Sequence, residues 1–176
     1  MPMSLARQFM VAAAAIAASA AAFAHEPGPH VHGVARLQIA LDGPLLTLFL
    51  DSPLDNLLGF EHFPSTEKQK AAVAALDSRL RRAQSVFLPT PAARCASTSV
   101  KLESPVFTPK APAAGDGHAD LKAEYVFRCE LPERLKDVDV RLFDGFPHMR
   151  RIEVQVAGPR GQASATLEVS RHRVNL

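Results

Sequence analysis

The segment GVARLQIALDGPLLTLFLDS, residues 33–52, constrains the fold more than any other part of the chain, because its apolar residues alternate with other residues. Successive side chains of a β-strand point to opposite faces of the sheet, so this period of two indicates strands with one buried face. The dipeptide Asp42-Gly43 interrupts the pattern and is typical of a tight turn. The alternating positions are Leu37, Ile39, Leu41, Leu46, Leu48 and Leu50. The segment therefore predicts a β-hairpin.

The remaining sequence predicts one long helix followed by more strands. Thr66 and Gln69 have the spacing of a capping box, and apolar residues then recur at intervals of three and four, which predicts a helix from near Thr66 to Ala83 or Gln84. Strand-like segments separated by Pro or Gly follow at 95–104, 119–131, 138–143, 151–157 and 163–169. Together these patterns predict an α+β fold with a mainly antiparallel sheet of about seven strands and one substantial helix.

The first 24 residues have the three zones of a secretory signal peptide. Arg7 precedes an alanine-rich apolar run that is too short for a stable membrane anchor, and small residues, Ala22 and Ala24, precede the expected cleavage point. Cleavage after Ala24 would leave residues 25–176 as a single metal-binding domain, exported to a periplasm or secreted. It would also make His25 the new N-terminus.

The two cysteines, Cys95 and Cys129, both lie in the exported part of the chain. In an oxidising compartment such a pair most simply forms a disulfide, which would stabilise the fold by about 3 to 4 kcal/mol through the loop that it closes. The alternative is that the two thiolates bind a metal ion.

Composition and motifs argue against several classes of function. Twenty Lys and Arg residues nearly balance 18 Asp and Glu residues, so charge does not indicate a nucleic-acid partner. The chain contains no G-x-S-x-G, H-E-x-x-H, P-loop or G-x-G-x-x-G motif. We therefore expect a binding protein and not an enzyme.

Histidines carry the most specific chemical signal, and the chain has seven of them. His30 and His32 would stand on the same side of a strand, about 6 to 7 Å apart, and could chelate one ion. A solvated N-terminal tail is the alternative interpretation of this pair. Imidazole combined with carboxylate suits zinc, copper or nickel.

Two further histidines, His62 and His118, and the carboxylate of Glu61 are candidates for a metal site. His62 follows Glu61 just before the predicted helix, although between Phe60 and Phe63 it could equally be a histidine that orders the start of the helix. His118 lies near Asp116 and Asp120 at the end of a Pro/Ala/Gly-rich loop and could simply be exposed. Basic neighbours disfavour a cation beside His148 and His172, so neither is placed in the predicted site.

The strings HVHGVARLQIALDG, SPLDNLLGFEH, HADLKAEYVFRCEL and VRLFDGFPHMRRIEVQV resemble the ZrgA-like periplasmic proteins, a bacterial family linked to zinc uptake. The resemblance covers about His30 to Leu176. It implies zinc binding, expression when zinc is scarce and a partnership with an ABC-type zinc importer. It also implies that His30, His32, His62 and His118 are metal ligands. Many relatives carry a long His/Asp-rich tract where this chain has only PVFTPKAPAAGDGH, so a zinc site here would rest on these few histidines.

The sequence thus predicts a periplasmic zinc-binding protein that buffers zinc or delivers it to an ABC-type importer, with Glu61 or water completing a site of three imidazoles. Two alternatives stay open. The chain could be an exported interaction module without a functional metal site, or a copper-binding protein that uses the amine and ring of His25. The native metal is not decided by the residues alone, because imidazole sites also bind copper and nickel.

Overall fold

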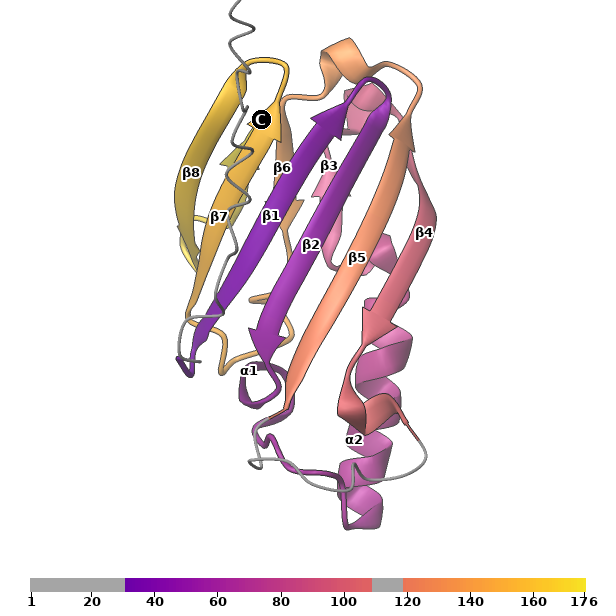
Figure 1. Cartoon of the computed structure of the whole chain (residues 1–176), viewed down its shortest axis with the longest axis vertical. Coiled ribbons are helices and arrows are strands. Elements are labelled where there is room, and N and C mark those ends of the chain that lie inside the picture. Colours follow the sequence, from indigo (N-terminus) through magenta and orange to yellow (C-terminus); the bar gives the residue numbers. More distant parts are fainter. Residues whose placement is uncertain (1–30, 109–118) are drawn as a thin grey trace, which may run out of the picture.

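A six-stranded sheet forms the main layer of the computed structural model, which describes residues 31–108 and 119–176 (Figure 1). Its strands follow the order β4-β5-β2-β1-β7-β8, and neighbouring strands are antiparallel except for β1 and β7, which are parallel. The strands are β1 (Val34–Asp42), β2 (Leu45–Pro53), β4 (Cys95–Glu103), β5 (Asp120–Cys129), β7 (Arg151–Gly158) and β8 (Gly161–Glu168). The predicted hairpin is confirmed as β1 and β2.

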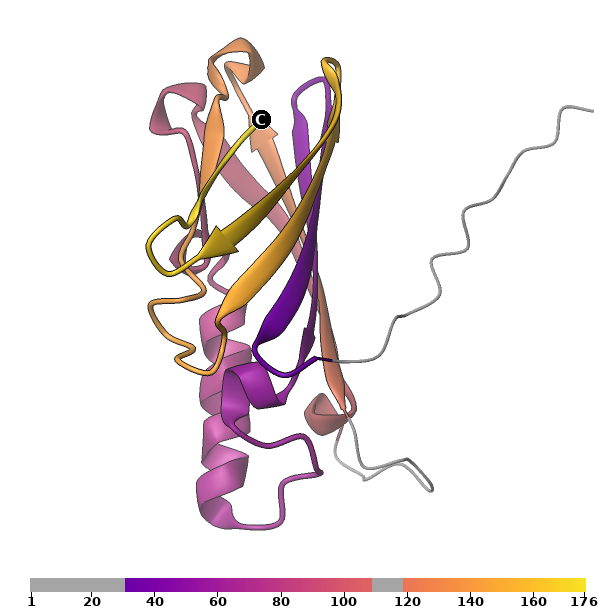
Figure 2. The same ribbon diagram turned by 90° about the vertical axis from the view of Figure 1, so that its left-hand side faces the viewer.

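The second layer lies on one face of this sheet and contains a small sheet and the main helix (Figure 2). The small sheet has the antiparallel order β3-β6-β9, with β3 (Phe87–Pro89), β6 (Asp137–Val140) and β9 (Arg173–Asn175). Phe87 of the small sheet meets Tyr125 of β5 edge to face, with ring centroids 5.0 Å apart, so the two layers share one core. The predicted α+β class, with a mainly antiparallel sheet and one substantial helix, is confirmed.

The main helix, α2 (Glu67–Leu80), begins where the sequence predicts. The Thr66 hydroxyl accepts a hydrogen bond from the Gln69 backbone, and the Gln69 side chain accepts one from the Thr66 backbone, which completes the capping box. The helix ends at Leu80, earlier than predicted, because Arg82 leaves the helical conformation and a 3-10 turn, η1 (Ala83–Ser85), carries Ala83 into the core. A four-residue helix, α1 (Asp55–Leu58), precedes α2.

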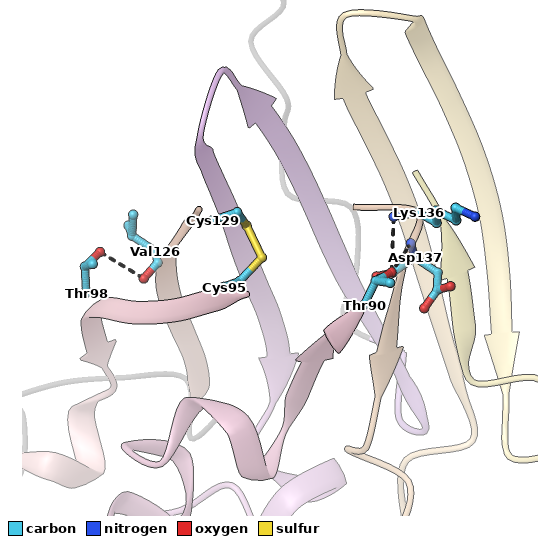
Figure 3. Close-up of a disulfide and its surroundings, with 7 residues drawn as sticks. All are labelled: Thr90, Cys95, Thr98, Val126, Cys129, Lys136 and Asp137. Carbon is cyan, nitrogen blue, oxygen red and sulfur yellow. Dashed lines mark hydrogen bonds between the residues drawn. A yellow bond between two sulfur atoms is a disulfide. The ribbon is translucent and has the colours of Figure 1, made fainter. Parts of the chain in front are cut away.

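The predicted disulfide is confirmed. Cys95 and Cys129 face each other at the paired ends of β4 and β5, where the disulfide joins the two strands (Figure 3). The register of these strands shifts at Thr98, whose hydroxyl donates to the Val126 carbonyl at 3.1 Å. The cysteines are consequently not available as thiolate ligands.

Three short 3-10 turns complete the secondary structure of the described residues: η2 (Pro91–Ala93), η3 (Pro105–Phe107) and η4 (Pro132–Arg134). Strands β3 and β9 were not predicted from the sequence, because three-residue strands are too short to show a period of two. None of the described helices has the length and apolar character that a membrane crossing requires.

Candidate metal centre

Three chain segments meet where β1 and β7 begin and β2 ends, close to α1 (Figure 1). Gly33 joins them through its backbone: its amide donates to the Asn56 side chain at 2.6 Å, and its carbonyl accepts from the Arg150 and Arg151 amides at 2.8 and 2.9 Å. Gly33 has a φ of +82°, a conformation that favours glycine. The backbone at His32 is therefore held beside both α1 and the start of β7.

Asn56 strengthens this junction from inside the protein. Its side-chain amide is buried and donates to the Val34 carbonyl at 2.9 Å and to the Ser52 hydroxyl at 3.1 Å. Ser52 is buried as well, so both polar side chains have partners where unpaired groups would be costly. The SPLDN string thus binds the end of β2 to the start of β1 and sets the position of Asp55.

The imidazole of His32 lies between two carboxylates. Its Nε2 is 3.1 Å from Glu61 Oε1, and its Nδ1 is 3.8 Å from Asp55 Oδ2. The His32 side chain is 59% exposed, whereas that of Glu61 is only 11% exposed. The predicted pair of His32 and Glu61 is thus brought together, and Asp55 joins it from the first turn of α1.

A second imidazole faces the same carboxylate from the segment before β7. His148 Nδ1 is 3.8 Å from Asp55 Oδ2, the oxygen that also faces His32. The His148 ring lies against Gly59, where an added Cβ would come within 3.2 Å of its Cε1 atom. We call His32, Asp55, Glu61 and His148 the sheet-end cluster.

The sheet-end cluster combines two imidazoles with two carboxylates, a donor set that suits zinc and its neighbours in the transition series. Within residues 31–108 and 119–176, no three His, Cys, Asp or Glu side chains are positioned to hold a metal ion without rearrangement. Metal binding at the cluster would therefore require its side chains to move closer together.

His62 has different neighbours. Its Nδ1 is 3.0 Å from the Phe63 carbonyl, its Nε2 is 3.3 Å from the Gln69 side-chain nitrogen, and its ring stacks on Phe60. This arrangement links His62 to the capping box of α2. A role for His62 as a ligand would require its Nε2 to leave Gln69, and that role stays a prediction.

A family model described as "ZrgA family zinc uptake protein" matches residues 29–176. The chain belongs to this family. The match includes every residue of the sheet-end cluster, and the resemblance seen in the sequence is confirmed. No curated protein matches the chain. Membership of the ZrgA family associates the chain with zinc uptake.

The other histidines predicted as ligands of this ZrgA family member, His30 and His118, lie outside the described residues, as does His25 of the copper alternative. Ala119, which follows His118 in the sequence, accepts a hydrogen bond from the Leu54 amide at 3.0 Å. The described chain thus resumes next to Asp55. His30 and His118 stay predictions.

Asp55 and His148 were not among the predicted site residues. Asp55 lies within the SPLDNLLGFEH string, but its contact with His32 depends on the fold. His148 was set aside because Arg150 and Arg151 follow it closely in the sequence. In the structure Arg151 instead contacts Glu153 at 3.3 Å, and the side-chain carbons of Arg150 lie next to Gly33.

Proposed function

We propose that the protein is an exported, non-enzymatic zinc carrier that binds the ion at the sheet-end cluster and passes it to an ABC-type importer. The observation that carries this proposal is the position of the His32 imidazole between the carboxylates of Glu61 and Asp55. Family membership supports zinc as the cargo, because the family is described by zinc uptake.

The chemistry of the available donors supports a site that exchanges its ion. Structural zinc sites are commonly closed and rich in thiolates, but both cysteines of this chain form a disulfide. The sheet-end cluster offers only imidazoles and carboxylates, and its two rings are more than half exposed. An ion bound there would lie at the surface, where an acceptor protein could reach it.

The disulfide also supports export. Disulfides persist in the periplasm and outside the cell and are rare in the cytosol, and the predicted signal peptide over residues 1–24 would direct the chain there. Those residues lie outside the described part of the chain. From the disulfide and the predicted signal peptide, we propose that the zinc carrier works in the periplasm.

The test is a zinc titration of the purified periplasmic protein in competition with a chromogenic chelator. We expect the wild-type protein to bind at least one equivalent of zinc at pH 7.5 and His32→Ala to weaken binding by more than about 100-fold, which exceeds the usual cost of losing an outer-sphere partner. His172→Ala is the matched control. That histidine also contacts an aspartate, Asp139 at 2.8 Å, but in the small sheet.

Two results would contradict the proposal. If the wild-type protein takes up less than roughly a tenth of an equivalent of zinc after reconstitution, it has no functional zinc site, and an interaction module is the better interpretation. If His32→Ala and His172→Ala bind zinc as tightly as the wild type, zinc binds elsewhere. Variants of His30, His62 and His118 then locate it.

A further inference from the structure

We infer that His148 and Asp55 are zinc ligands together with His32, and that Glu61 orients the His32 ring without contacting the ion. The inference rests on the proposed function, since it takes zinc to bind at the sheet-end cluster. It replaces the predicted role of Glu61 and assigns ligand roles to two residues that the sequence motifs did not indicate.

The distances around Asp55 support this assignment. One carboxylate oxygen, Oδ2, is 3.8 Å from Nδ1 of His32 and 3.8 Å from Nδ1 of His148. Ligand atoms on a tetrahedral zinc ion with bonds of about 2.0 to 2.1 Å lie about 3.3 to 3.4 Å apart. For each of these two nitrogen–oxygen pairs, the approach needed is about 0.4 to 0.5 Å.

The two carboxylates beside His32 favour different positions of the ring proton. Glu61 Oε1 is 3.1 Å from Nε2, whereas Asp55 Oδ2 is 3.8 Å from Nδ1, so the nearer Glu61 carboxylate favours a proton on Nε2. The lone pair of a neutral His32 ring is then on Nδ1, which faces Asp55. Two electron-rich atoms face each other there, and a cation between them removes their repulsion.

Glu61 then has the role that carboxylates commonly have behind metal-binding histidines. A carboxylate that accepts the second ring N–H fixes the tautomer and the orientation of the ring. The Glu61 side chain is 11% exposed and the His32 side chain is 59% exposed, so the enclosed carboxylate can position the exposed ring. Glu61 is accordingly a positioning residue.

The side chains of His32 and His148 are exposed enough to rotate toward a bound ion. Their side chains are 59% and 54% exposed, and rotation of an exposed side chain between staggered positions meets little resistance. Asp55 is 24% exposed and is attached to α1, so it provides the fixed corner of the site. Three protein ligands leave a fourth position open to water or to a ligand of the acceptor.

The experiment compares zinc affinities of single variants by the same chelator competition. We expect His148→Ala and Asp55→Ala to weaken zinc binding by more than about 100-fold, and Glu61→Gln to weaken it by about 10 to 100-fold or less, the range for outer-sphere partners. Glu67→Gln, which removes an exposed carboxylate at the start of α2, should leave the affinity unchanged. Circular dichroism of each variant reports whether it is folded.

X-ray absorption of the zinc-loaded protein provides a readout that a merely structural role would not change. We expect the imidazole contribution to fall by one ligand in His148→Ala and to stay constant in Glu61→Gln.

If His32→Ala loses zinc while folded His148→Ala and Asp55→Ala retain wild-type affinity, the inference is overturned and the proposed function stands. If Glu61→Gln loses as much affinity as Asp55→Ala, Glu61 is a ligand and its assigned role is wrong. A wild-type protein that binds no zinc contradicts both this inference and the proposed function.

Discussion

Asn56 shows how one buried side chain positions several groups of the candidate site. Its amide contacts the backbone at Gly33 and Val34 and the hydroxyl of Ser52. A hydrogen bond of this kind contributes about 1 kcal/mol, but a buried donor left without its partner costs about 1 to 3 kcal/mol. The side chain therefore holds Asp55, the preceding residue of α1, near His32 with little freedom to separate.

Tyr125 is also buried, but its polar group lacks hydrogen bonds of the kind that Asn56 makes. Its ring is fully buried, and its hydroxyl has no hydrogen-bond partner within the described part of the chain. Tyr125→Phe retains the ring that packs against Phe87 and removes the unpaired group. We expect urea unfolding at pH 8 to show a gain in the free energy of unfolding of about 1 to 3 kcal/mol.

The same variant has a distinct dependence on pH. Burial raises the pKa of Tyr125 above its ordinary value of about 10. Above pH 10 the unfolded chain therefore releases a proton that the folded protein retains, so wild-type stability falls as the pH rises. Tyr125→Phe should show a smaller loss between pH 9 and 10.5 than the wild type. Equal losses in the two proteins would contradict the assignment of this effect to Tyr125.

At the scale of elements, the sequence predicted helices and strands that depend on residues close together in the chain. It did not predict contacts between segments that are far apart in the chain. Alternation identified the hairpin of β1 and β2, and the spacing of Thr66 and Gln69 identified the start of α2. His32 was expected from the family resemblance, and Glu61 from the need for a fourth donor beside three imidazoles. His148 was missed because its contact with Asp55 depends on the parallel pairing of β1 with β7, which no local pattern encodes.

The start of α2 allows a test that separates helix stability from zinc binding. Thr66→Ala removes the hydroxyl that accepts from the Gln69 amide, and loss of such a cap costs about 1 kcal/mol. Urea unfolding should show this loss, whereas the zinc affinity should not change. Thr66→Ser retains a hydroxyl and should behave like the wild type. A Thr66→Ser protein as destabilised as Thr66→Ala would show that the hydroxyl is not the cause.

At the scale of the whole molecule, the hydrophobic core and the disulfide do not include the imidazoles of the sheet-end cluster. The hydrophobic core joins both sheets with α2, and the disulfide links β4 to β5, whereas both cluster imidazoles are largely exposed. A protein whose fold depends on zinc unfolds when the ion is removed. The arrangement of this chain predicts instead that the fold persists without zinc, as a carrier must when it has delivered its cargo.

Removal of zinc with a chelator tests this expectation directly. The far- and near-ultraviolet circular dichroism of the treated protein should match that of the loaded protein, and thermal unfolding should stay cooperative. Free zinc at 100 times its dissociation constant should add about 2.7 kcal/mol to the free energy of unfolding. For a chain of this size that corresponds to a rise in Tm of about 5 to 11 °C. His32→Ala should show no such rise. Loss of the near-ultraviolet signal on chelation would instead mean that zinc is part of the fold, because a structural ion and its protein unfold together.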